Sequence, residues 1–508
     1  MNKALLLLGI TQAYDIAKDC GAVPKKGDSV SLEDTQNNAK AIMKCIEMAN
    51  SDDTEDRSVI VPKGQLFSTM PVWASNLFNI TLTIDGVLET SPYLDDWTLN
   101  EVGDRTRQFI EFTDSSRLTI NGEGIVEGQG YDWWVREWNL QNHYSRPNLL
   151  SFQRVQYAEI EGVLWRNSPR YHMDLNDVDS IYVHDCEIYV DILKQSDVMN
   201  KPRHSDTDWI LDALSGDYLN AFTDMLGDHS MLSMPTMPLN TDGIDPSGSN
   251  ITIRNVNITN FDDAVAVKPS HTTSKIAKDG CSQDILVENC NVKFGVGMTI
   301  GSVPPRDTHA CIRRVTFKNI DFEYPLKAIY VKTNPGQGTG EIKDILYEDI
   351  KIHFPVWWNI YIGPQQQHQP DGGGPGCLTY PFGGCETQPL IDVGNITIRN
   401  LESHGGFLPP GVIRCNQTNE CYDINFENVN ITGWWEAMNW GWISEYAHGS
   451  VVNTYPDPQL GAPSQRVFEL FTIKHMIEFL EQCNIVYVNN ENDITAWEVL
   501  IGFVIWGL

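Results

Sequence analysis

The sequence has few basic side chains and lacks long apolar runs. Its 508 residues carry 36 lysines and arginines against 67 aspartates and glutamates, which gives a formal net charge of −31. Surplus positive charge is what neutralises nucleic-acid phosphates and holds proteins on anionic lipid, so the composition argues against both partners. No run of about eighteen apolar residues occurs, which argues against a conventional membrane-spanning helix.

The eleven cysteines form no paired Cys-x-x-Cys motif of the kind that binds structural zinc. Several lie at close spacing, which favours disulfides with one thiol left over and leaves their connectivity open. Disulfides are typical of proteins in oxidising, extracellular compartments. The closely spaced cysteines are Cys20 and Cys45, Cys281 and Cys290, Cys377 and Cys385, and Cys415 and Cys421.

The two ends of the chain and its glycosylation motifs also bear on location. Met1–Ala13 has a positive start, an apolar stretch and small residues, as secretory signals do; a hydrophobic first strand is the alternative. Val499–Leu508 is apolar but too short to span a bilayer. Three interpretations of this segment stay open: a lipid-anchor tail, a docking strand and a translation artefact. We expect a secreted, extracellular protein, with wall or surface association as a variant. Six Asn-x-Ser/Thr motifs agree with export: Asn79, Asn250, Asn257, Asn395, Asn416 and Asn430.

A short phrase recurs through the second half of the chain. Each copy alternates β-branched and polar residues, which is typical of a strand. The Asn or Asp at the fifth position of each phrase recurs after 34, 30, 30, 51 and 28 residues. A period near thirty predicts one supersecondary unit stacked on the next. The copies are Ile251–Val256, Ile285–Cys290, Val315–Ile320, Ile345–Ile350, Ile396–Leu401 and Ile424–Val429.

These short strands and polar turns predict an all-β fold, a parallel β-helix with long loop insertions. Its rungs would hydrogen-bond to each other about 4.8 Å apart, and Asn at the repeated corner tolerates left-handed backbone angles. A propeller is the alternative, but its blades need four antiparallel strands and more residues per repeat. The predicted division is a signal peptide at 1–13, the β-helix at 14–432 and an extension of uncertain structure at 433–508.

Two insertions interrupt the predicted coil. The first, about 198–233, has no strand pattern and precedes the acidic motif described next, so it is either a lid or a variable surface loop. The second, about 365–388, is rich in glycine and proline. Because it contains Cys377 and Cys385, we expect a loop pinned by a disulfide.

Two acidic segments lie twenty residues apart. Asp242 and Asp245 stand in the phrase that begins at Asn240, and Asp262 is followed directly by Asp263. In a stacked coil this offset can place the segments side by side. Crowded carboxylates resist joint ionisation, so one acid should hold a proton beside ionised bases, as glycosidic cleavage requires. Turn-capping aspartates and a calcium site are the alternatives.

The order Asn-Thr-Asp-Gly-x-Asp, then Asp-Asp, resembles glycoside hydrolase family 28, the polygalacturonases and their pectin-degrading relatives. The resemblance covers roughly residues 15–432 outside the two insertions. Lys332 stands where the family has the lysine of its Arg-x-Lys phrase. Further matching segments are Cys20–Ala22, Asp34–Thr35, Val61–Gly64, Asn121–Gly124, Trp133–Trp134, Arg146–Pro147 and Asn167–Pro169.

The resemblance implies a right-handed parallel β-helix and an inverting hydrolase of α-linked galacturonan that needs no metal and no organic cofactor. Carried over by position, Asp262 would be the general acid, and Asp242 and Asp263 would orient and deprotonate the attacking water. Lys332 would pair with a substrate carboxylate through charge-assisted hydrogen bonds. Further substrate-binding candidates are Tyr330, Lys268, Asn240 and Asp245.

Three positions depart from the family pattern. Val296 replaces the histidine of Gly-His-Gly, which is thought to tune the protonation of the acid, and Tyr330 replaces the arginine of Arg-x-Lys. Gly248 stands where the family often has asparagine. His271 or His309 could substitute for the missing histidine, although a lone histidine is more often a surface residue.

We therefore expect a secreted hydrolase that cleaves α-galacturonosidic bonds in pectic polysaccharide, and a monomer. A non-catalytic or altered-specificity pectic-glycan-binding protein is the first alternative, and a structural fibre or adhesin is the second. Because the net charge repels a polyanion, binding needs a local basic groove. Candidates for that groove and for stacking on sugars are Lys268, Lys332, Arg306, Arg313, Trp357, Trp358 and Tyr361, with core packing as the alternative for the three aromatic residues.

Overall fold

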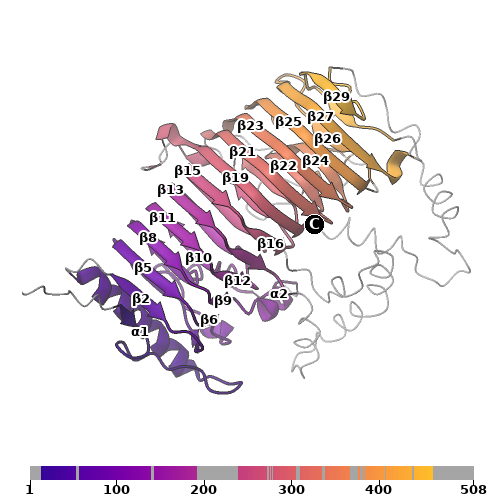
Figure 1. Cartoon of the computed structure of the whole chain (residues 1–508). Helices are drawn as coiled ribbons and strands as arrows, with labels where there is room; N and C mark the ends of the chain where they lie inside the picture. The colour runs from indigo at the N-terminus through magenta and orange to yellow at the C-terminus, as the bar shows by residue number, and fades with distance from the viewer. Residues whose placement is uncertain are drawn as a thin grey trace, which may run out of the picture.

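The computed structural model is a long coil of parallel strands, with the first described strands at one end and the last at the other (Figure 1). Nearly all its strands pair in parallel with strands one coil away, so the predicted parallel β-helix is confirmed and the propeller is excluded. The structure describes residues 13–52, 57–138, 142–191, 238, 240–271, 274, 276, 278–304, 309–334, 338–366, 376–377, 380, 384–406, 408–436 and 440–461.

Three stacks of strands form the walls of the coil. The first wall contains the predicted repeat. Its strands are β1 (Tyr14–Asp15), β2 (Ser58–Val61), β5 (Phe78–Ile84), β8 (Ser116–Asn121), β11 (Gln156–Glu161) and β29 (Val451–Tyr455), together with parts of β13 (Met173–His184), β15 (Ile244–Arg254), β19 (Cys281–Phe294), β21 (His309–Glu323), β23 (Thr339–His353), β25 (Ile391–Gly406) and β27 (Tyr422–Gly433).

The second wall continues the first after a corner, so the long strands from β19 onward belong to both. Its separate strands are β3 (Leu66–Thr69), β6 (Val87–Thr90), β9 (Ile125–Glu127), β12 (Leu164–Arg166), β14 (Glu187–Tyr189) and β16 (Asn257–Asn260).

The third wall carries the side chains that matter below. It contains the first residues of β13 and β15 and the strands β4 (Val72–Ser75), β7 (Ile110–Thr113), β10 (Leu150–Gln153), β17 (Val265–Val267), β20 (Met298–Val303), β22 (Lys327–Thr333), β24 (Trp358–Pro364), β26 (Gly411–Arg414) and β28 (Ile443–Glu445). The short strand β18 (Ser270–His271) pairs antiparallel with β21.

Two α-helices accompany the strands in the part of the chain that the structure describes. Helix α1 (Leu32–Ser51) lies at the N-terminal end of the coil (Figure 1) and contacts β2 to β5. Its buried face includes Ile42, Cys45 and Ile46, and the side chain of Ser31 accepts a hydrogen bond from the N–H of Asp34 as the N-cap. Short helix α2 (Tyr131–Trp138) and the 3-10 turns η1 (Leu94–Asp96), η3 (Lys278–Gly280) and η4 (Trp434–Glu436) complete the described helices, none of which could span a membrane.

The repeated phrases stack in register. Ile251, Ile285 and Val315 are partners on successive coils, and Ile345, Ile396 and Ile424 continue the same column. All six side chains are at most 2% exposed, so each coil places one aliphatic side chain directly on the next inside the coil. The column explains why the phrase repeats: every coil has to fill the same position of one continuous core.

The corner between the first two walls requires left-handed backbone. Asn255, Asn289, Asn319, Asp349, Asn400 and Asn428 all have φ between 53° and 57°. Side chains of successive corners are hydrogen-bonded, for example Asn428 Nδ2 to Asn400 Oδ1 (3.2 Å) and Asn400 Nδ2 to Asp349 Oδ1 (3.0 Å). The left-handed backbone at this corner was predicted, whereas the hydrogen bonds between the side chains of successive corners are shown only by the structure.

The boundaries of the coil differ from the sequence prediction at one end. We predicted that the β-helix ends at residue 432, but β28 and β29 continue the parallel stacks to Tyr455. The reason is that these strands are short and lack the repeated phrase. The predicted signal peptide lies outside the described residues except for Ala13, and the insertion at 198–233 and residues 462–508 lie wholly outside them.

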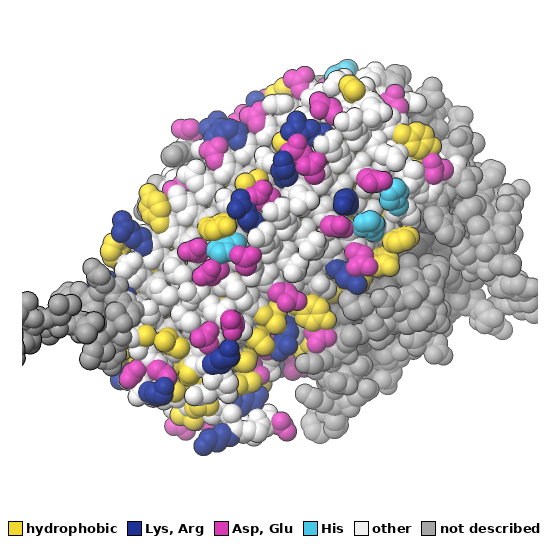
Figure 2. All heavy atoms as spheres, viewed as in Figure 1, with side chains coloured by type: hydrophobic (Ala, Val, Ile, Leu, Met, Phe, Trp, Pro, Cys, Tyr) yellow, Lys and Arg dark blue, Asp and Glu magenta, His cyan; other side chains and the backbone are white. Residues whose placement is uncertain are grey.

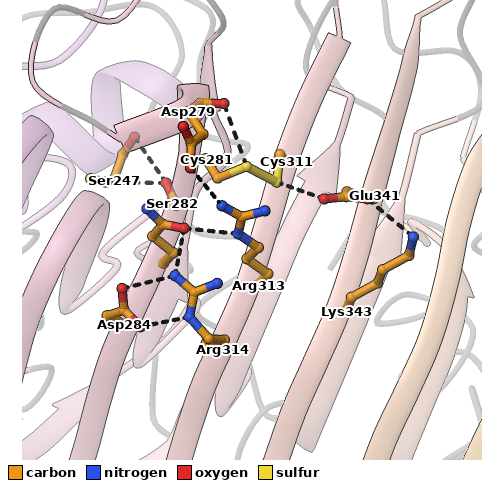
Figure 3. Close-up of a disulfide and its surroundings, with 12 residues drawn as sticks. Ser247, Asp279, Cys281, Ser282, Asp284, Cys311, Arg313, Arg314, Glu341 and Lys343 are labelled. Carbon is orange, nitrogen blue, oxygen red and sulfur yellow. Dashed lines mark hydrogen bonds and ion pairs between the residues drawn. A yellow bond between two sulfur atoms is a disulfide. The ribbon is translucent and has the colours of Figure 1, made fainter.

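Three of the four closely spaced cysteine pairs form disulfides, Cys20–Cys45, Cys377–Cys385 and Cys415–Cys421. The second of these confirms that the insertion at 365–388 contains a disulfide. Cys281, however, bonds Cys311, its register partner on the next coil, rather than the nearby Cys290 (Figure 3). Stacking brings positions thirty residues apart together, whereas Cys290 points into the core. Within the described chain Cys186 and Cys290 are both free, one more than expected.

Charged side chains of both signs are intermixed on the face of the coil that Figure 2 shows, and several charged pairs join neighbouring coils. Around the disulfide in Figure 3, Arg313 reaches Asp279 and Arg314 reaches Asp284. One such group is centred on His184, whose Nε2 lies 3.0 Å from Glu159 and whose Nδ1 lies 2.7 Å from Asp185. Burial alone would lower the pKa of His184, but the carboxylates raise it above 6.5.

We predict that Asn400→Ala lowers the free energy of unfolding by about 2 kcal/mol, because alanine disfavours the left-handed corner and loses the hydrogen bonds of the amide. Asn400→Gly is the matched control, because glycine tolerates the angle and loses only the amide, so its loss should be smaller. Equilibrium denaturant unfolding measures both changes. Equal losses for the two variants would show that backbone strain does not matter at this corner.

His184→Gln should lower stability more at pH 5 than at pH 9. A histidine with a raised folded pKa contributes stability that is fully present below its unfolded pKa, near 6.5, and is lost as the pH rises through the folded pKa. The control is His353→Gln, since the His353 side chain is 43% exposed and meets one carboxylate, that of Asp321. Thermal unfolding at the two pH values measures the difference, and an equal loss at both would contradict the raised pKa.

Candidate active site

The two acidic segments meet at the turn that leads into the third wall. Asp242 stands just before β15, and Asp262 and Asp263 stand just before β17. Ile244 of β15 is the register partner of Val265 of β17, and the N–H of Gly243 donates to the carbonyl of Asp263 at 2.9 Å. Carboxylate oxygens of the three acids lie within 4.8 Å of one another. The twenty-residue offset therefore brings the acids together, as expected.

Asn260 braces the two segments, and sequence analysis missed it. Its side chain is fully buried, and Nδ2 donates to the carbonyls of Thr241 (3.0 Å), Asp262 (3.0 Å) and Asp263 (2.8 Å). Thr241 adds a bond from the N–H of Phe261 to its hydroxyl. The position of Asn260 at the end of a strand, two residues before Asp-Asp, was a usable signal, because Asn often closes turns through its side chain.

Asp262 is the more exposed acid of the cluster. Its Oδ2 accepts from the N–H of Asn240 (3.0 Å) and lies at the limit of reach of the amide of the same residue (3.5 Å), while Oδ1 accepts from the N–H of Asp263 (2.9 Å). Its side chain is half-buried, whereas Asp242 and Asp263 are 3% and 1% exposed. Burial and then the charge of Asp263 raise the pKa of Asp262, and Lys332 only partly opposes them.

The pKa of Asp263 is shifted in the opposite direction, below its ordinary value. Burial alone would raise its pKa, but Lys332 and Lys268 lower it below its ordinary value. Lys332 Nζ donates to Oδ2 at 2.7 Å, and the Thr299 hydroxyl donates to Oδ1 at 2.7 Å. Asp263 is thus an ionised carboxylate beside Asp262, which favours the proton. This separation of pKa values within one pair is what general acid and base chemistry needs.

Asp242 and Asp245 share the lysine Lys268. Its Nζ lies 3.3 Å from Asp245 Oδ2 and 3.9 Å from Asp242 Oδ2. Burial raises the pKa of Asp242 well above its usual value, with help from Asp245 and Asp262, and raises that of Asp245 to about 7 against the pull of Lys268. The Lys268 side chain is 30% exposed, so together with Asp262 it connects the carboxylate cluster to solvent.

Four carboxylates face two ammonium groups here, so the cluster cannot be fully ionised without excess negative charge. We use "carboxylate cluster" for Asp242, Asp245, Asp262 and Asp263. By distance alone, Asp242, Asp262 and Asp263 could surround a cation. Lys268 and Lys332 already supply positive charge to these acids.

Arg146 and Arg170 stand beside the cluster, and sequence analysis did not name either of them as a site residue. Arg146 Nη2 donates to Asn240 Oδ1 at 2.8 Å. Arg170 lies over the ring of Tyr171, 4.3 Å from its centre, and Lys268 Nζ lies 5.8 Å from the same centre. These positive charges form a local basic region in an acidic protein. The segments Arg146–Pro147 and Asn167–Pro169 were the signal that pointed toward them.

Two of the three departures from the family pattern fall in one apolar group, which we call the aromatic cluster. It contains Val296, Tyr330, Trp358, Tyr361 and Tyr380. Tyr330, a predicted substrate-binding residue, is fully buried, so it packs in the protein interior. Trp358 and Tyr361 are 3% and 0% exposed, which confirms core packing for these two aromatic residues.

The other departure has a steric cause. A Cβ at Gly248 would lie 1.9 Å from the carbonyl oxygen of Val178, and the φ of Gly248 is +142°. A bulge in β13 between Leu175 and Val178 brings this carbonyl close. Only glycine therefore fits at position 248.

Several candidates are not brought to the cluster. Arg313 is paired with Asp279 and Gln283 on the first wall (Figure 3). His309 is exposed and bonded to Thr339. Arg306 and the side chain of His271 lie outside the described residues.

Comparison with known proteins places the geometry in context. The chain is 24% identical over 345 residues to a probable rhamnogalacturonase C of Aspergillus flavus, which covers 66% of this chain and 57% of that protein. It is 22% identical over 333 residues to an exopolygalacturonase of Platanus acerifolia, 64% of this chain and 69% of that protein. The chain thus matches little more than half to two thirds of the length of these relatives.

Solved structures share the fold. A polygalacturonase from Erwinia carotovora superposes with a TM-score of 0.58 at 17% identity, covering 84% of this chain and 95% of that one. A hyperthermoactive exopolygalacturonase from Thermotoga maritima gives 0.56 at 18% identity, with coverage of 84% and 92%. The sequence profile of the glycosyl hydrolases family 28 matches residues 52–440. The chain belongs to glycosyl hydrolase family 28.

Proposed function

We propose that this protein is a secreted glycoside hydrolase that cleaves α-galacturonosidic bonds in pectic polysaccharide. The observation that carries the proposal is the carboxylate cluster, in which Asp262 and Asp263 are adjacent and their pKa values are shifted in opposite directions. Family membership supports a pectin-degrading activity. The four disulfides and the mostly exposed Asn-x-Ser/Thr motifs support export.

In this proposal Asp262 donates its proton to the leaving glycosidic oxygen. It is the half-buried acid with a raised pKa, so it can hold a proton and reach a substrate. Asp263 is held ionised by Lys332 and deprotonates the attacking water, and Asp242 orients that water. Asn240 fixes the orientation of the Asp262 carboxyl through its N–H.

Charge near the cluster favours an acidic sugar. Lys268 is partly exposed and stands beside Arg170 and Tyr171, so a substrate carboxylate could displace part of its contact with Asp245. Lys332 is 5% exposed and bonded to Asp263, so we assign it to orienting that base as well as to binding substrate. This local positive charge offsets the long-range repulsion from the net charge of −31.

The stereochemical course is a separate part of the proposal. An inverting pair usually has its carboxyl groups about 6.5–9.5 Å apart and a retaining pair about 5–5.5 Å. The contacts within 4.8 Å here are closer to the retaining spacing. Inversion is therefore supported by the family resemblance and not by this spacing, and proton NMR of the first-formed product anomer decides it.

A non-catalytic glycan-binding protein is the second candidate. It is favoured by the burial of Val296 and Tyr330 where the family has polar residues. Such a protein would bind pectic fragments without releasing reducing ends.

We expect Asp262→Asn to lower kcat about 10²–10⁴-fold, because asparagine cannot donate the proton. The assay is reducing-sugar release from polygalacturonate, rhamnogalacturonan and xylogalacturonan. Asp321→Asn makes the same chemical change on the outer surface, where Asp321 meets only His353, and should leave the rate unchanged. If wild type and Asp262→Asn release equally little sugar from all three but still bind glycan, the protein is the non-catalytic alternative.

Lys332→Met should move the acidic limb of the kcat/KM profile to higher pH. Lys332 is the main group that lowers the pKa of Asp263, so its loss lets the base take up a proton at higher pH. Lys332→Arg keeps the charge and should keep the limb near its original position. A rate loss without movement of the limb in Lys332→Met would show that Lys332 acts in substrate binding alone.

A further inference from the structure

A second lysine lies close to the carboxylate cluster and has no role in the mechanism above. Lys327 begins β22 and is 1% exposed. Its Nζ lies 4.5 Å from the ring centre of Tyr330 and 4.6 Å from that of Trp357. Within the part of the chain that the structure describes, no carboxylate is within ion-pair distance of Nζ. A lysine is rarely buried without a partner, so this position needs an explanation.

The coil register relates Lys327 to the cluster. Val265, Met298 and Ile329 are partners on successive coils. Asp263, Val296 and Lys327 each stand two residues before these partners, so they occupy one corner on three successive coils. Val296, the position that lacks the family's histidine, is therefore between Asp263 and Lys327.

Backbone contacts agree with this order. The N–H of Val296 donates to the carbonyl of Asp262 at 2.8 Å, and the N–H of Leu326 donates to the carbonyl of Gly295 at 2.8 Å. A Cβ at Gly297 would lie 2.4 Å from the carbonyl oxygen of Lys327. The coil that carries Val296 is thus in direct contact with the coils of Asp262 and Lys327.

The ring of Tyr330 lies beside the ammonium groups of both lysines of β22. Lys332 Nζ lies 5.0 Å from the centre of the ring that Lys327 also contacts, and the same Nζ is bonded to Asp263. An aromatic face attracts an ammonium group but does not neutralise it. The charge of Lys327 therefore acts on Lys332 and on the acids through the buried interior of the coil.

The charged groups that act on Lys327 are Lys332 of β22 and Asp262 and Asp263 before β17, and the titratable ring that its amine contacts is that of Tyr330. Tyr361 of β24 lies against Tyr330, and Tyr380 belongs to the same aromatic cluster. Burial, and then the charge of Lys332, lower the pKa of Lys327 to about 7, while Asp263 and Asp262 oppose the shift. At acidic pH the amine is charged, and that charge favours the ionised form of both acids.

We propose that Lys327 is a positioning residue for the hydrolysis: its amine, one coil beyond Val296 and enclosed by Tyr330 and Trp357, sets the protonation of Asp262 where position 296 has no histidine to do so. The proposal rests on the proposed function for its catalytic meaning. The electrostatic link between Lys327 and Asp262 exists whether or not the protein is a hydrolase.

The first experiment is the pH profile of kcat/KM for wild type, Lys327→Met and Lys327→Arg. Methionine removes the charge in a similar volume, so Asp262 keeps its proton to higher pH and the basic limb should move up by roughly one unit. Arginine keeps the charge, so its basic limb should stay near that of wild type. Lys351→Met, on the exposed face of β23, is the matched control and should leave the profile unchanged. A rate loss in Lys327→Met without movement of the limb would overturn the proposal.

The second experiment does not need activity. Stability is measured from pH 5 to 9 for wild type, Lys327→Met, Asp262→Asn and the double variant. Because the folded pKa of Lys327 is lowered, the unfolded state binds more protons above it, so the stability of Lys327→Met relative to wild type should fall as the pH rises from about 7 to 9. An interaction between the two sites appears as non-additive losses in the double variant.

The two experiments separate the two proposals. If wild type releases no sugar but the losses are non-additive, the hydrolase proposal fails and the link between Lys327 and Asp262 stands. Additive losses at every pH overturn the link, even in an active enzyme.

Discussion

Register between successive coils is the constraint on which the rest of this structure depends. Every coil has to place its aliphatic residue under that of the next, as the column from Ile251 to Ile424 does, and has to turn with left-handed backbone at the same corner. A slip of one residue would expose the column and bury the polar side chains of each strand. The asparagines of the corner hold this register through hydrogen bonds from coil to coil.

The same register creates the candidate site. The turns into the third wall carry Asp242, then Asp262 and Asp263, then Val296 and then Lys327 on successive coils. Carboxylates that are twenty residues apart in sequence become neighbours because one coil separates them. Their crowding is tolerated because Lys268 and Lys332 face them, and these lysines make the acids unequal. Asp263 receives the close ion pair and Asp262 does not, so the two neighbouring residues favour different protonation states.

Two of the departures from the family pattern, Val296 and Tyr330, are structurally connected. The aromatic cluster occupies the places of the missing histidine and arginine, and Tyr330 and Trp357 enclose the amine of Lys327. The apolar Val296 and the buried Lys327 stand on neighbouring coils, and both lie beside Tyr330. The disulfide Cys377–Cys385 of the second insertion packs on the same cluster, so this insertion stabilises the region next to the acids.

Sequence alone determined the coil and the identity of its acids. The repeated phrase revealed the first wall because each coil must fill the same core position, and the Asn-Thr-Asp and Asp-Asp motifs stood at an offset of one coil. Only the tertiary structure decided which acid is ionised, since this depends on Lys332 reaching Asp263 from 69 residues away, and that Cys281 bonds Cys311 on the next coil. It also decided that Tyr330 is buried, that Asn260 braces the turns and that the coil continues to Tyr455. These features arise from contacts between coils, which a local pattern along one strand does not contain.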